Sequence, residues 1–404
     1  MGIRSEKERC TWAQFDALQL GSGWDEEDIG KPQILVEDAY GDSHPGSIHL
    51  NQLGEQAVYG IYEKGGHPAR FHVTDICDGC AQGHDGMNLV LASREVICDM
   101  IEMHAGFVPW DGMILSSSCD KSIPAHLKAA ARVDIPAIFI PGGSMRPGPR
   151  QTTSLVAGDI SLRQKRNNEI TPDEIRDYKL TGCPSQGACT FMGTASTMQC
   201  MAEALGLALP GSALAPATMR DILAMARKAG RKIMELAAKN IRPSQILTPA
   251  AFRNAIVIHS AIGGSTNALL HLPAIAHEAG ISINLHMINE ISEKTPNLCH
   301  LAPAGHHHMQ DLMQAGGISA VLKELLDGGM IDGSCMTVTG KTLGENVAHA
   351  KNRDPEVIRP LDRPYTKTGG PAVLFGNLAP TGAIVNRPAV TQDMLVTPGT
   401  APCF

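Results

Sequence analysis

The sequence predicts an α/β protein in which a parallel sheet is covered by helices on both faces. Short apolar runs alternate with helix-length segments through about the first third of the chain, which is typical of βαβ units. The runs contain Ile, Val and Leu with little polar alternation, as in strands that are buried on both faces. Aromatic residues make up only 4% of the chain, whereas Gly occurs 41 times and Pro 26 times. This composition favours a loop-rich α/β enzyme over an all-β binding module.

The predicted strands and helices of this sheet alternate along the chain. The strands are short and apolar, and they cover 34–36, 69–77, 110–115 and 135–141. The helices have apolar residues at helical spacing, and they cover 49–64, 93–106 and 125–133. We expect Gly65 to end the first helix, Ser93 to cap the second and Gly106 to end it.

The remainder of the chain is predicted to be mostly helical. Residues 158–180 carry many charges and are expected on the surface. Helical periods and Gly-rich breaks predict a helix over 194–205, an amphipathic helix pair over 219–240, a strand, a Gly-rich loop and a helix over 254–280, and a helix in two pieces over 309–329. Past Pro364 the period becomes that of Gly-bounded β segments, so a β domain is expected to begin near Lys367.

Composition also excludes several classes of protein. The formal net charge of -7 argues against a nucleic-acid partner, and no apolar run reaches the ~18 residues that a membrane span needs. No secretory signal is recognisable at the start of the chain. Because the 11 cysteines are odd in number, we expect reduced thiols and a cytoplasmic protein, or one of an organelle matrix.

Ligands of parallel sheets bind beyond the carboxyl ends of the strands. The loops that follow the second, third and fourth predicted strands are therefore the expected place for chemistry. They cover Asp75–Gly86, Ser116–Pro124 and Pro141–Pro149, and each is rich in Gly, Cys, Asp or Ser.

The triplet Cys119-Asp120-Lys121 stands in the second of these loops. A thiolate suits a soft or borderline metal and a carboxylate suits a hard one, so neighbouring side chains on a loop can reach two different ions. Taken alone, the triplet is more readily explained by a buried Cys beside a surface ion pair.

Further cysteines lie in two other Gly-rich loops. Cys77, Asp78 and Cys80 form a C-x-x-C pair without a second such pair, which argues against structural zinc and leaves a redox pair or an ordinary turn open. Cys183 and Cys189 stand in the string GCPSQGAC. Thiols in three separated loops without a matching His set favour an iron–sulfur cluster over zinc.

Two other motifs have weaker functional interpretations. The string AIGGSTNALLH, residues 261–271, could bind an anion at a helix N-terminus or be an ordinary turn into a helix. The run of three His at 306–308 is interpreted as a solvated loop, because consecutive side chains do not converge on one ion. His49 and His84 are of interest because they lie beside the expected site loops.

Taken in order, these strings resemble the dihydroxy-acid dehydratase and phosphogluconate dehydratase family. The matching strings are CDG-x-x-x-G-x-x-GM from Cys77, SREVI from Ser93, CDK-x-x-P from Cys119, GAC-x-x-MGTA, GGSTNA-x-LHLPAIA and TVTGKTLGEN. The resemblance extends from about Gly30 to Val385, and the ordered set is far more specific than any single motif.

The resemblance implies a large α/β domain followed by a smaller swivelling β-barrel, and a hydro-lyase that converts a 2,3-dihydroxy acid to a 2-keto acid. It implies an iron–sulfur cluster, [2Fe–2S] or [4Fe–4S], on Cys119 and Cys189. It also implies Mg²⁺ on Asp78 and Asp120, with Lys121 as the lysine that some members carbamylate into another metal ligand. The chain is then divided into an N-terminal extension (1–30), the α/β domain (31–365) and the start of the barrel (366–404). We expect a homodimer or homotetramer with a small-molecule substrate.

Two departures from the family pattern bear on the site. Many members have a cluster Cys in a PC-x-x-HL string, where this chain has Gly46, so Cys77 is the expected third thiolate. The family's GMPE and GRFSGG strings, which supply a metal-binding Glu and a catalytic Ser, are absent, so we expect an incomplete barrel and identify no catalytic base. Branched-chain dihydroxy acids are the first expected substrates of an amino-acid biosynthesis enzyme. Sugar acids such as xylonate, arabinonate and gluconate, or an inactive cluster-binding remnant, are the alternatives.

Overall fold

A four-stranded parallel sheet organises the first third of the chain in the computed structural model, which describes residues 4–9, 11–167, 170–390 and 394. The strand order is β2-β1-β3-β4. The strands are β1 (Gln33–Asp38), β2 (His67–His72), β3 (Gly112–Ser117) and β4 (Ala137–Pro141). All residues of β1, β3 and β4 are buried, so the predicted parallel sheet with apolar strands is confirmed.

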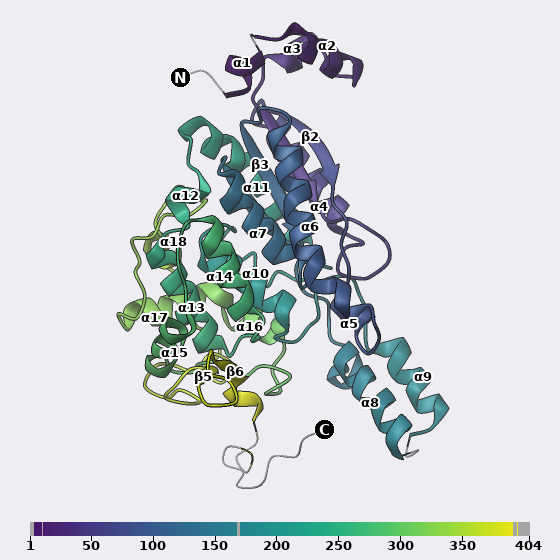
Figure 1. The fold of residues 1–404 in the computed structure, drawn as a ribbon, viewed down its shortest axis with the longest axis vertical. Helices are drawn as coiled ribbons and strands as arrows, with labels where there is room; N and C mark the ends of the chain where they lie inside the picture. The colour runs from purple at the N-terminus through teal and green to yellow at the C-terminus, as the bar shows by residue number, and fades with distance from the viewer. Residues whose placement is uncertain (1–3, 10, 168–169, 391–393, 395–404) are drawn as a thin grey trace.

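Helices cover both faces of this sheet (Figure 1). Helices α4 (Leu50–Tyr62) and α11 (Arg220–Lys239) pack against each other on one face, and α6 (Met87–Gly106) and α7 (Ser122–Val133) pack on the other. The first pair crosses at very close range, because a Cβ at Gly230 would lie 2.0 Å from the Ala57 carbonyl oxygen. Glycine is therefore required where the two backbones meet.

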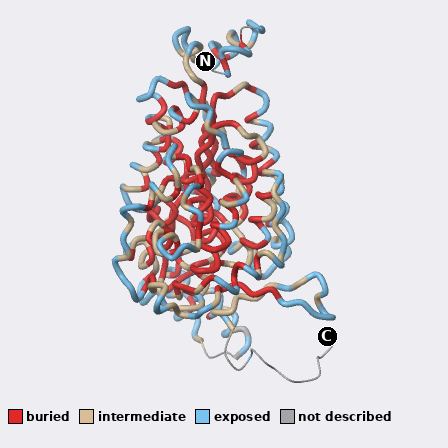
Figure 2. Tube along the Cα trace, turned by 90° about the vertical axis from the view of Figure 1, so that its left-hand side faces the viewer, coloured by how far each residue is buried: buried red, intermediate tan, exposed pale blue. Residues whose placement is uncertain are grey.

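A second, helical part of the molecule packs beside the sheet and is built around α13 (Pro249–Ile262). Its other helices are α10 (Thr194–Ala204), α12 (Pro243–Ile246), α14 (Ala268–Glu278), α15 (Leu285–Lys294), α16 (Met309–Ala315), α17 (Gly317–Asp327) and α18 (Leu343–Val347). All of α10 and most of α13 are buried, and Figure 2 shows the buried part of the chain running through the centre of the molecule.

The remaining elements lie at the margins of the molecule (Figure 1). They are α1 (Arg4–Arg9), α2 (Ala13–Gly21) and α3 (Glu26–Ile29) at one end, α5 (Asp78–Ala81), η1 (Pro149–Gln151), α8 (Ser154–Asn167) and α9 (Pro172–Thr181), and the antiparallel pair β5 (Pro371–Leu374) and β6 (Ala383–Asn386) with η2 (Arg387–Ala389). Helices α8 and α9 project from the body as an exposed arm, as the charge of residues 158–180 predicts. The C-terminal β pair begins at Pro371, inside the segment 366–404 that is predicted to start a barrel, and residues 391–393 and 395–404 of that segment lie outside the described residues.

Three element predictions were wrong. Residues 254–262 form helix α13 instead of a strand, because a fully buried apolar run has no period that separates the two and Thr248 caps the helix through the Ala251 N–H. The helix predicted from Ser93 begins at Met87, and the Ser93 hydroxyl donates to the Val90 carbonyl within it. The predicted helix pair over 219–240 is the single helix α11.

No helix in the described part of the chain is long and apolar enough to cross a membrane.

Candidate metal centre and active site

The candidate site lies at the carboxyl edge of the parallel sheet. Strand β2 lies on one side of β1, and β3 and β4 lie on the other side. The strand order therefore reverses between β1 and β3. Such a switch point leaves a crevice beyond the strand ends. The loop after β1 contributes His44, the loop after β2 Cys77 and the loop after β3 Cys119.

These three side chains come together. One ring nitrogen of His44 and the Sγ atoms of Cys77 and Cys119 all lie within 4.8 Å of one another. Within the described ranges this is the one group of three or more His, Cys, Asp or Glu side chains close enough to hold a metal ion. Cys119 is 6% exposed and His44 also 6%, so the group is shielded from bulk water.

The local backbone prepares Cys77 to be a thiolate. Cys77 precedes α5, and hydrogen bonds from the Cys119 thiol and from the backbone of Cys80 and Gly79 lower the pKa of Cys77 to about 5. The same contact with Cys77, together with burial, raises the pKa of the Cys119 thiol. The pair therefore holds one negative charge before any metal is bound.

Cys189 approaches the same crevice from another direction. Its loop pairs with the loop after β4, since the Met145 N–H donates to the Ala188 carbonyl over 2.8 Å, and the Gly187 N–H donates to the Pro45 carbonyl over 2.8 Å. The Cys189 Sγ lies 3.8 Å from the Ser154 hydroxyl, and burial raises its pKa to about 12. It is outside the compact group of His44, Cys77 and Cys119.

The other predicted side chains fall into two groups. Cys80, Cys183 and His84 are exposed, and His84 bonds the Cys80 carbonyl over 3.0 Å. His49 is buried and bonds the Gly142 carbonyl over 2.6 Å, so it joins the loops after β1 and β4 without entering the thiol group.

Two carboxylates and a lysine form a charged cluster beside the thiols. The Lys121 ammonium is 2.5 Å from Asp78 Oδ2 and is buried. The Ala195 N–H, in the first turn of α10, donates to Asp120 Oδ1 over 2.8 Å. Burial, and then the charge of Asp78, raises the pKa of Asp120 to about 6. Two carboxylates that repel each other in a buried crevice are a donor set for a hard cation.

Buried polar atoms without partners indicate what this crevice is built to hold. His44 Nδ1, Asp75 Oδ1 and Asp78 Oδ1 are buried and have no hydrogen-bond partner among the described residues. Orphaned buried acceptors are costly unless another group satisfies them. Soft thiolates on one side and hard carboxylates on the other fit a soft-metal centre next to a hard cation.

The Gly-Gly-Ser-Thr loop before α14 adjoins the same cluster. Ser265 Oγ lies 3.4 Å from Thr194 Oγ1 at the start of α10, and the Ser265 N–H donates to Thr197 Oγ1 over 3.0 Å. Helix α10 thus links the loop to Asp120. Whether the loop binds an anion stays a prediction.

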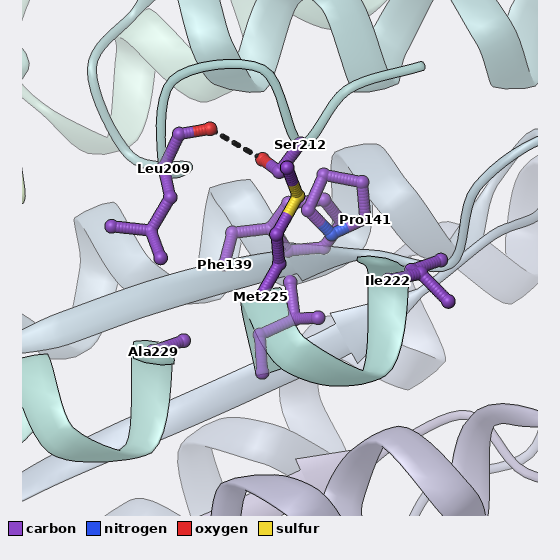
Figure 3. Close-up of a pocket in the computed structure, with 8 residues that line it drawn as sticks. Phe139, Pro141, Leu209, Ser212, Ile222, Met225 and Ala229 are labelled. Carbon is purple, nitrogen blue, oxygen red and sulfur yellow. Dashed lines mark hydrogen bonds between the residues drawn. The ribbon is translucent and has the colours of Figure 1, made fainter. Parts of the chain in front are cut away.

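The small cavity shown in Figure 3 is separate from this chemistry. It lies between β4 and α11 and is lined by apolar side chains, among them Phe139, Ile222 and Met225. Its one hydroxyl, on Ser212, donates to the Leu209 carbonyl over 2.6 Å. A cavity whose polar groups are satisfied internally offers no handle for a polar substrate.

His44 is the site residue that the sequence interpretation missed. It stands in GDSHPG, after a predicted strand, and the loops after strands were the expected place for ligands. That position is the signal in the sequence, although the three loops predicted to carry chemistry follow the second, third and fourth strands.

Thiols, a neighbouring imidazole and two carboxylates at the carboxyl edge of a parallel sheet form a candidate metal site on an α/β fold. Comparison with known proteins shows the family to which the chain belongs. The chain belongs to the dihydroxy-acid/6-phosphogluconate dehydratase family: the N-terminal family model matches residues 31–346 and the C-terminal model matches 356–404. It is therefore an enzyme of the dehydratase, or hydro-lyase, class, as its motifs predict.

Curated relatives are similar over most of their length. A dihydroxy-acid dehydratase of Acetivibrio thermocellus is 47% identical over 394 residues, which are 97% of this chain and 71% of the relative. Dihydroxy-acid dehydratases of Desulfatibacillum aliphaticivorans and Halothermothrix orenii are 45% and 44% identical, and the matches cover 72% and 74% of those proteins.

Proposed function

We propose that this protein removes water from a 2,3-dihydroxy acid to give a 2-keto acid, with branched-chain dihydroxy acids as its first substrates. The observation that carries the proposal is the meeting of Cys77 and Cys119 beside Asp78, Asp120 and Lys121 at the carboxyl edge of the sheet. The names of the relatives, all dihydroxy-acid dehydratases, support the substrate class.

The proposed ligands of an iron–sulfur cluster are the thiolates of Cys77, Cys119 and Cys189. Three protein thiolates leave one iron open, and such an iron supplies a Lewis acid for a departing hydroxide. Burial of Cys119 and Cys189 keeps bulk water away from the centre. The loop that carries Cys189 is bonded through the Gly187 N–H to the Pro45 carbonyl. This bond fixes Cys189 relative to the loop after β1.

The proposed Mg²⁺ ligands are Asp78 and Asp120, with Lys121 beside them. Mg²⁺ prefers carboxylate oxygens, and Asp78 has an unpaired buried oxygen to offer. Bound there, the ion supplies positive charge for the substrate carboxylate and C2 oxygen. Lys121 either neutralises Asp78, as its 2.5 Å contact permits, or becomes a ligand after carbamylation.

The role proposed for the charged cluster is to position the substrate. The N-terminus of α10 holds Asp120, and the Ser265 loop bonds to the same helix, so both groups keep a fixed place. To no residue in the described ranges do we assign the role of the base that takes the C2 proton.

Turnover by the anaerobically purified chain tests this proposal. The substrates to compare are 2,3-dihydroxyisovalerate, xylonate, arabinonate and gluconate, each with Mg²⁺ and a reconstituted cluster. We expect 2-keto acid from 2,3-dihydroxyisovalerate above all. Preference for an aldonate would select the sugar-acid alternative, and bound cluster without turnover of any acid would select the inactive remnant.

We further propose the domain division at residue 365 and a homodimeric or homotetrameric assembly. Light scattering of the purified chain tests the assembly, and a monomer at working concentration would contradict it.

A further inference from the structure

The loop after β1 brings an imidazole against the two thiols. His44 is buried, and one of its ring nitrogens lies within 4.8 Å of both the Cys77 and the Cys119 sulfur. It comes from a different loop than either cysteine, so the contact is produced by the fold and not by sequence proximity.

Hydrogen bonding fixes which ring nitrogen is free. The Ser47 hydroxyl donates its proton to the Gly41 carbonyl over 2.8 Å, so it accepts from the His44 Nε2–H, 3.3 Å away. A neutral imidazole with its proton on Nε2 has a lone pair on Nδ1. That Nδ1 atom is buried and has no hydrogen-bond partner in the described part of the chain.

Ser47 bonds the Nε2 side of the ring, and the carboxylate of Asp75 lies beside it. Asp75 Oδ2 lies 4.0 Å from His44 Nε2 and accepts from the Ser122 hydroxyl over 2.9 Å. Histidines that bind metals almost always donate their other ring N–H to an oxygen nearby, which fixes the tautomer and the ring orientation. His44 has that arrangement on its Nε2 side.

Gly46 opens the space between the ring and the sulfur. A Cβ at this position would lie 3.2 Å from His44 Nδ1 and 3.4 Å from Cys119 Sγ. The free lone pair and the thiol therefore flank the same point, and a side chain there would crowd the ring. The absence of a side chain at Gly46 and the presence of His44 are thus two parts of one arrangement.

We infer that His44 Nδ1 is a nitrogen ligand of the metal centre in the substrate-free protein, beside Cys77 and Cys119. The inference rests on the proposed function, since it assigns one more ligand to the proposed cluster. Histidine nitrogen replaces thiolate in some iron–sulfur centres and raises their reduction potential. With Cys189 the donors would be one nitrogen and three sulfurs, and the uncharged imidazole is the donor that a substrate oxygen would displace.

Pulsed electron paramagnetic resonance of the reduced centre is the direct test. The full chain is prepared with ¹⁴N- or ¹⁵N-labelled histidine and reconstituted anaerobically with iron and sulfide. We expect a strong nitrogen coupling that changes with the isotope and weakens when 2,3-dihydroxyisovalerate is added. The wild-type measurement needs no variant, so it stands even if a substitution prevents folding.

Two variants sharpen the assignment. His44→Cys is expected to lose the histidine coupling and to lower the reduction potential of the centre, because a charged thiolate replaces a neutral ring. His84→Ala is the matched control, since His84 is an exposed histidine that bonds the Cys80 carbonyl in the neighbouring loop. This variant is expected to change neither the nitrogen coupling nor the reduction potential.

The outcomes separate this inference from the proposed function. Three results would overturn the inference and leave the proposed function standing. They are a bound cluster without histidine coupling, a histidine coupling that survives in His44→Cys, and a coupling that saturating 2,3-dihydroxyisovalerate leaves unchanged. A chain that takes up no iron and sulfide at all would overturn both.

Discussion

At the residue scale, two positions of the chain can place a sulfur beside the Cys119 thiol. Cys77 supplies a sulfur next to Cys119, and a Cβ at Gly46 would lie 3.4 Å from the same Cys119 sulfur. Two backbone positions in different loops therefore point at one place. The family resemblance implies a cluster Cys at the position of Gly46, which adjoins the same sulfur.

Exchanging the two positions tests the thiolate assignment. Cys77→Ser is expected to lose iron, sulfide and the visible absorption of a cluster, because a serine oxygen is a poor ligand for a soft metal. Adding Gly46→Cys to Cys77→Ser is expected to restore part of the absorption, after a shift of a few tenths of an ångström by the His44 ring. The measurements are iron and sulfide content and the absorption spectrum after anaerobic reconstitution.

Cys80→Ser is the control for this exchange, because Cys80 is exposed and lies in the same loop as Cys77. It is expected to keep the cluster. A Cys77→Ser protein with full iron and sulfide would show that Cys77 is not a ligand.

Asp78 is the residue on which the hard-cation proposal depends most. Asp78→Asn removes a charge from the carboxylate pair, and we expect Mg²⁺ to bind at least about tenfold more weakly, by analogy with the 10–100-fold losses seen when even supporting groups are removed. The measurement is the Mg²⁺ dependence of turnover, together with calorimetric titration of the protein with Mg²⁺.

Asp85→Asn is the matched control, since Asp85 is an exposed carboxylate in the same loop. If both variants bind Mg²⁺ like the wild type, Asp78 has no part in the ion's site and its bond to Lys121 is structural.

His44 shows why part of the site could not be read from the sequence. The cysteines and Asp120 stand in motifs whose residue types suggest metal chemistry, so they were named in advance. His44 shares its loop with His49, and its place beside the thiols depends on the packing of loops after three different strands. The one signal in the sequence is the place of His44 after a predicted strand, and this does not show which side chains of the three loops converge.

At the element scale, the two helices that cover one face of the sheet, α4 and α11, cross at very close range. Gly60 and Gly230 lie at this crossing, and Cβ atoms there would come 2.2 Å from the Arg227 carbonyl oxygen and 2.0 Å from the Ala57 carbonyl oxygen. Backbone atoms cannot move aside as a flexible side chain would. The two helices therefore approach each other only because both positions are glycine.

Gly230→Ala is expected to destabilise the protein by about 3 kcal/mol, at the upper end of the usual cost of overpacking, because the helices must separate. Gly106→Ala, on the exposed last residue of α6, meets no atom within 4 Å and is expected to be neutral or to stabilise by up to about 1 kcal/mol. Denaturant unfolding of both variants gives the comparison. Equal stability of the two would contradict the close crossing.

The helices and strands also show which parts of the fold the sequence predicts. The strands of the sheet and the helices between them were predicted because apolar runs alternate with Gly stops. Helix α13 was not, because a helix buried almost all round shows neither a helical nor a strand period. Thr248 followed by Pro249, a capping residue before Pro at the first helical position, is the helix-start signal that this segment carries.

At the scale of the whole molecule, a buried acid couples folding to pH. Glu37 on β1 is buried, and its carboxylate faces His104 Nδ1 on α6 over 3.1 Å. Burial, and then the charge of Asp38, raises the pKa of Glu37 from 4.5 to about 8. The folded protein therefore binds this proton more tightly than the unfolded chain, and stability falls as pH rises from about 4.5 to about 8.

Glu37→Gln keeps the shape and removes the titration. The stability of the variant relative to the wild type is expected to increase between these pH values by up to about 4 kcal/mol, since the pKa of Glu37 rises from 4.5 to about 8 and each pKa unit corresponds to about 1.4 kcal/mol. Urea unfolding at several pH values gives this difference. A difference that is constant with pH would show that Glu37 is ionised in the folded protein at all of them.

The central claim is that the thiols at the carboxyl edge of the sheet serve a dehydratase. The most direct measurement is formation of 2-keto acid from 2,3-dihydroxyisovalerate by the anaerobically reconstituted chain with Mg²⁺, compared with Cys119→Ser. We predict product from the wild type and none from the variant, together with loss of iron and sulfide from the variant. Equal turnover by both proteins, or no turnover by a fully loaded wild type, would contradict the claim.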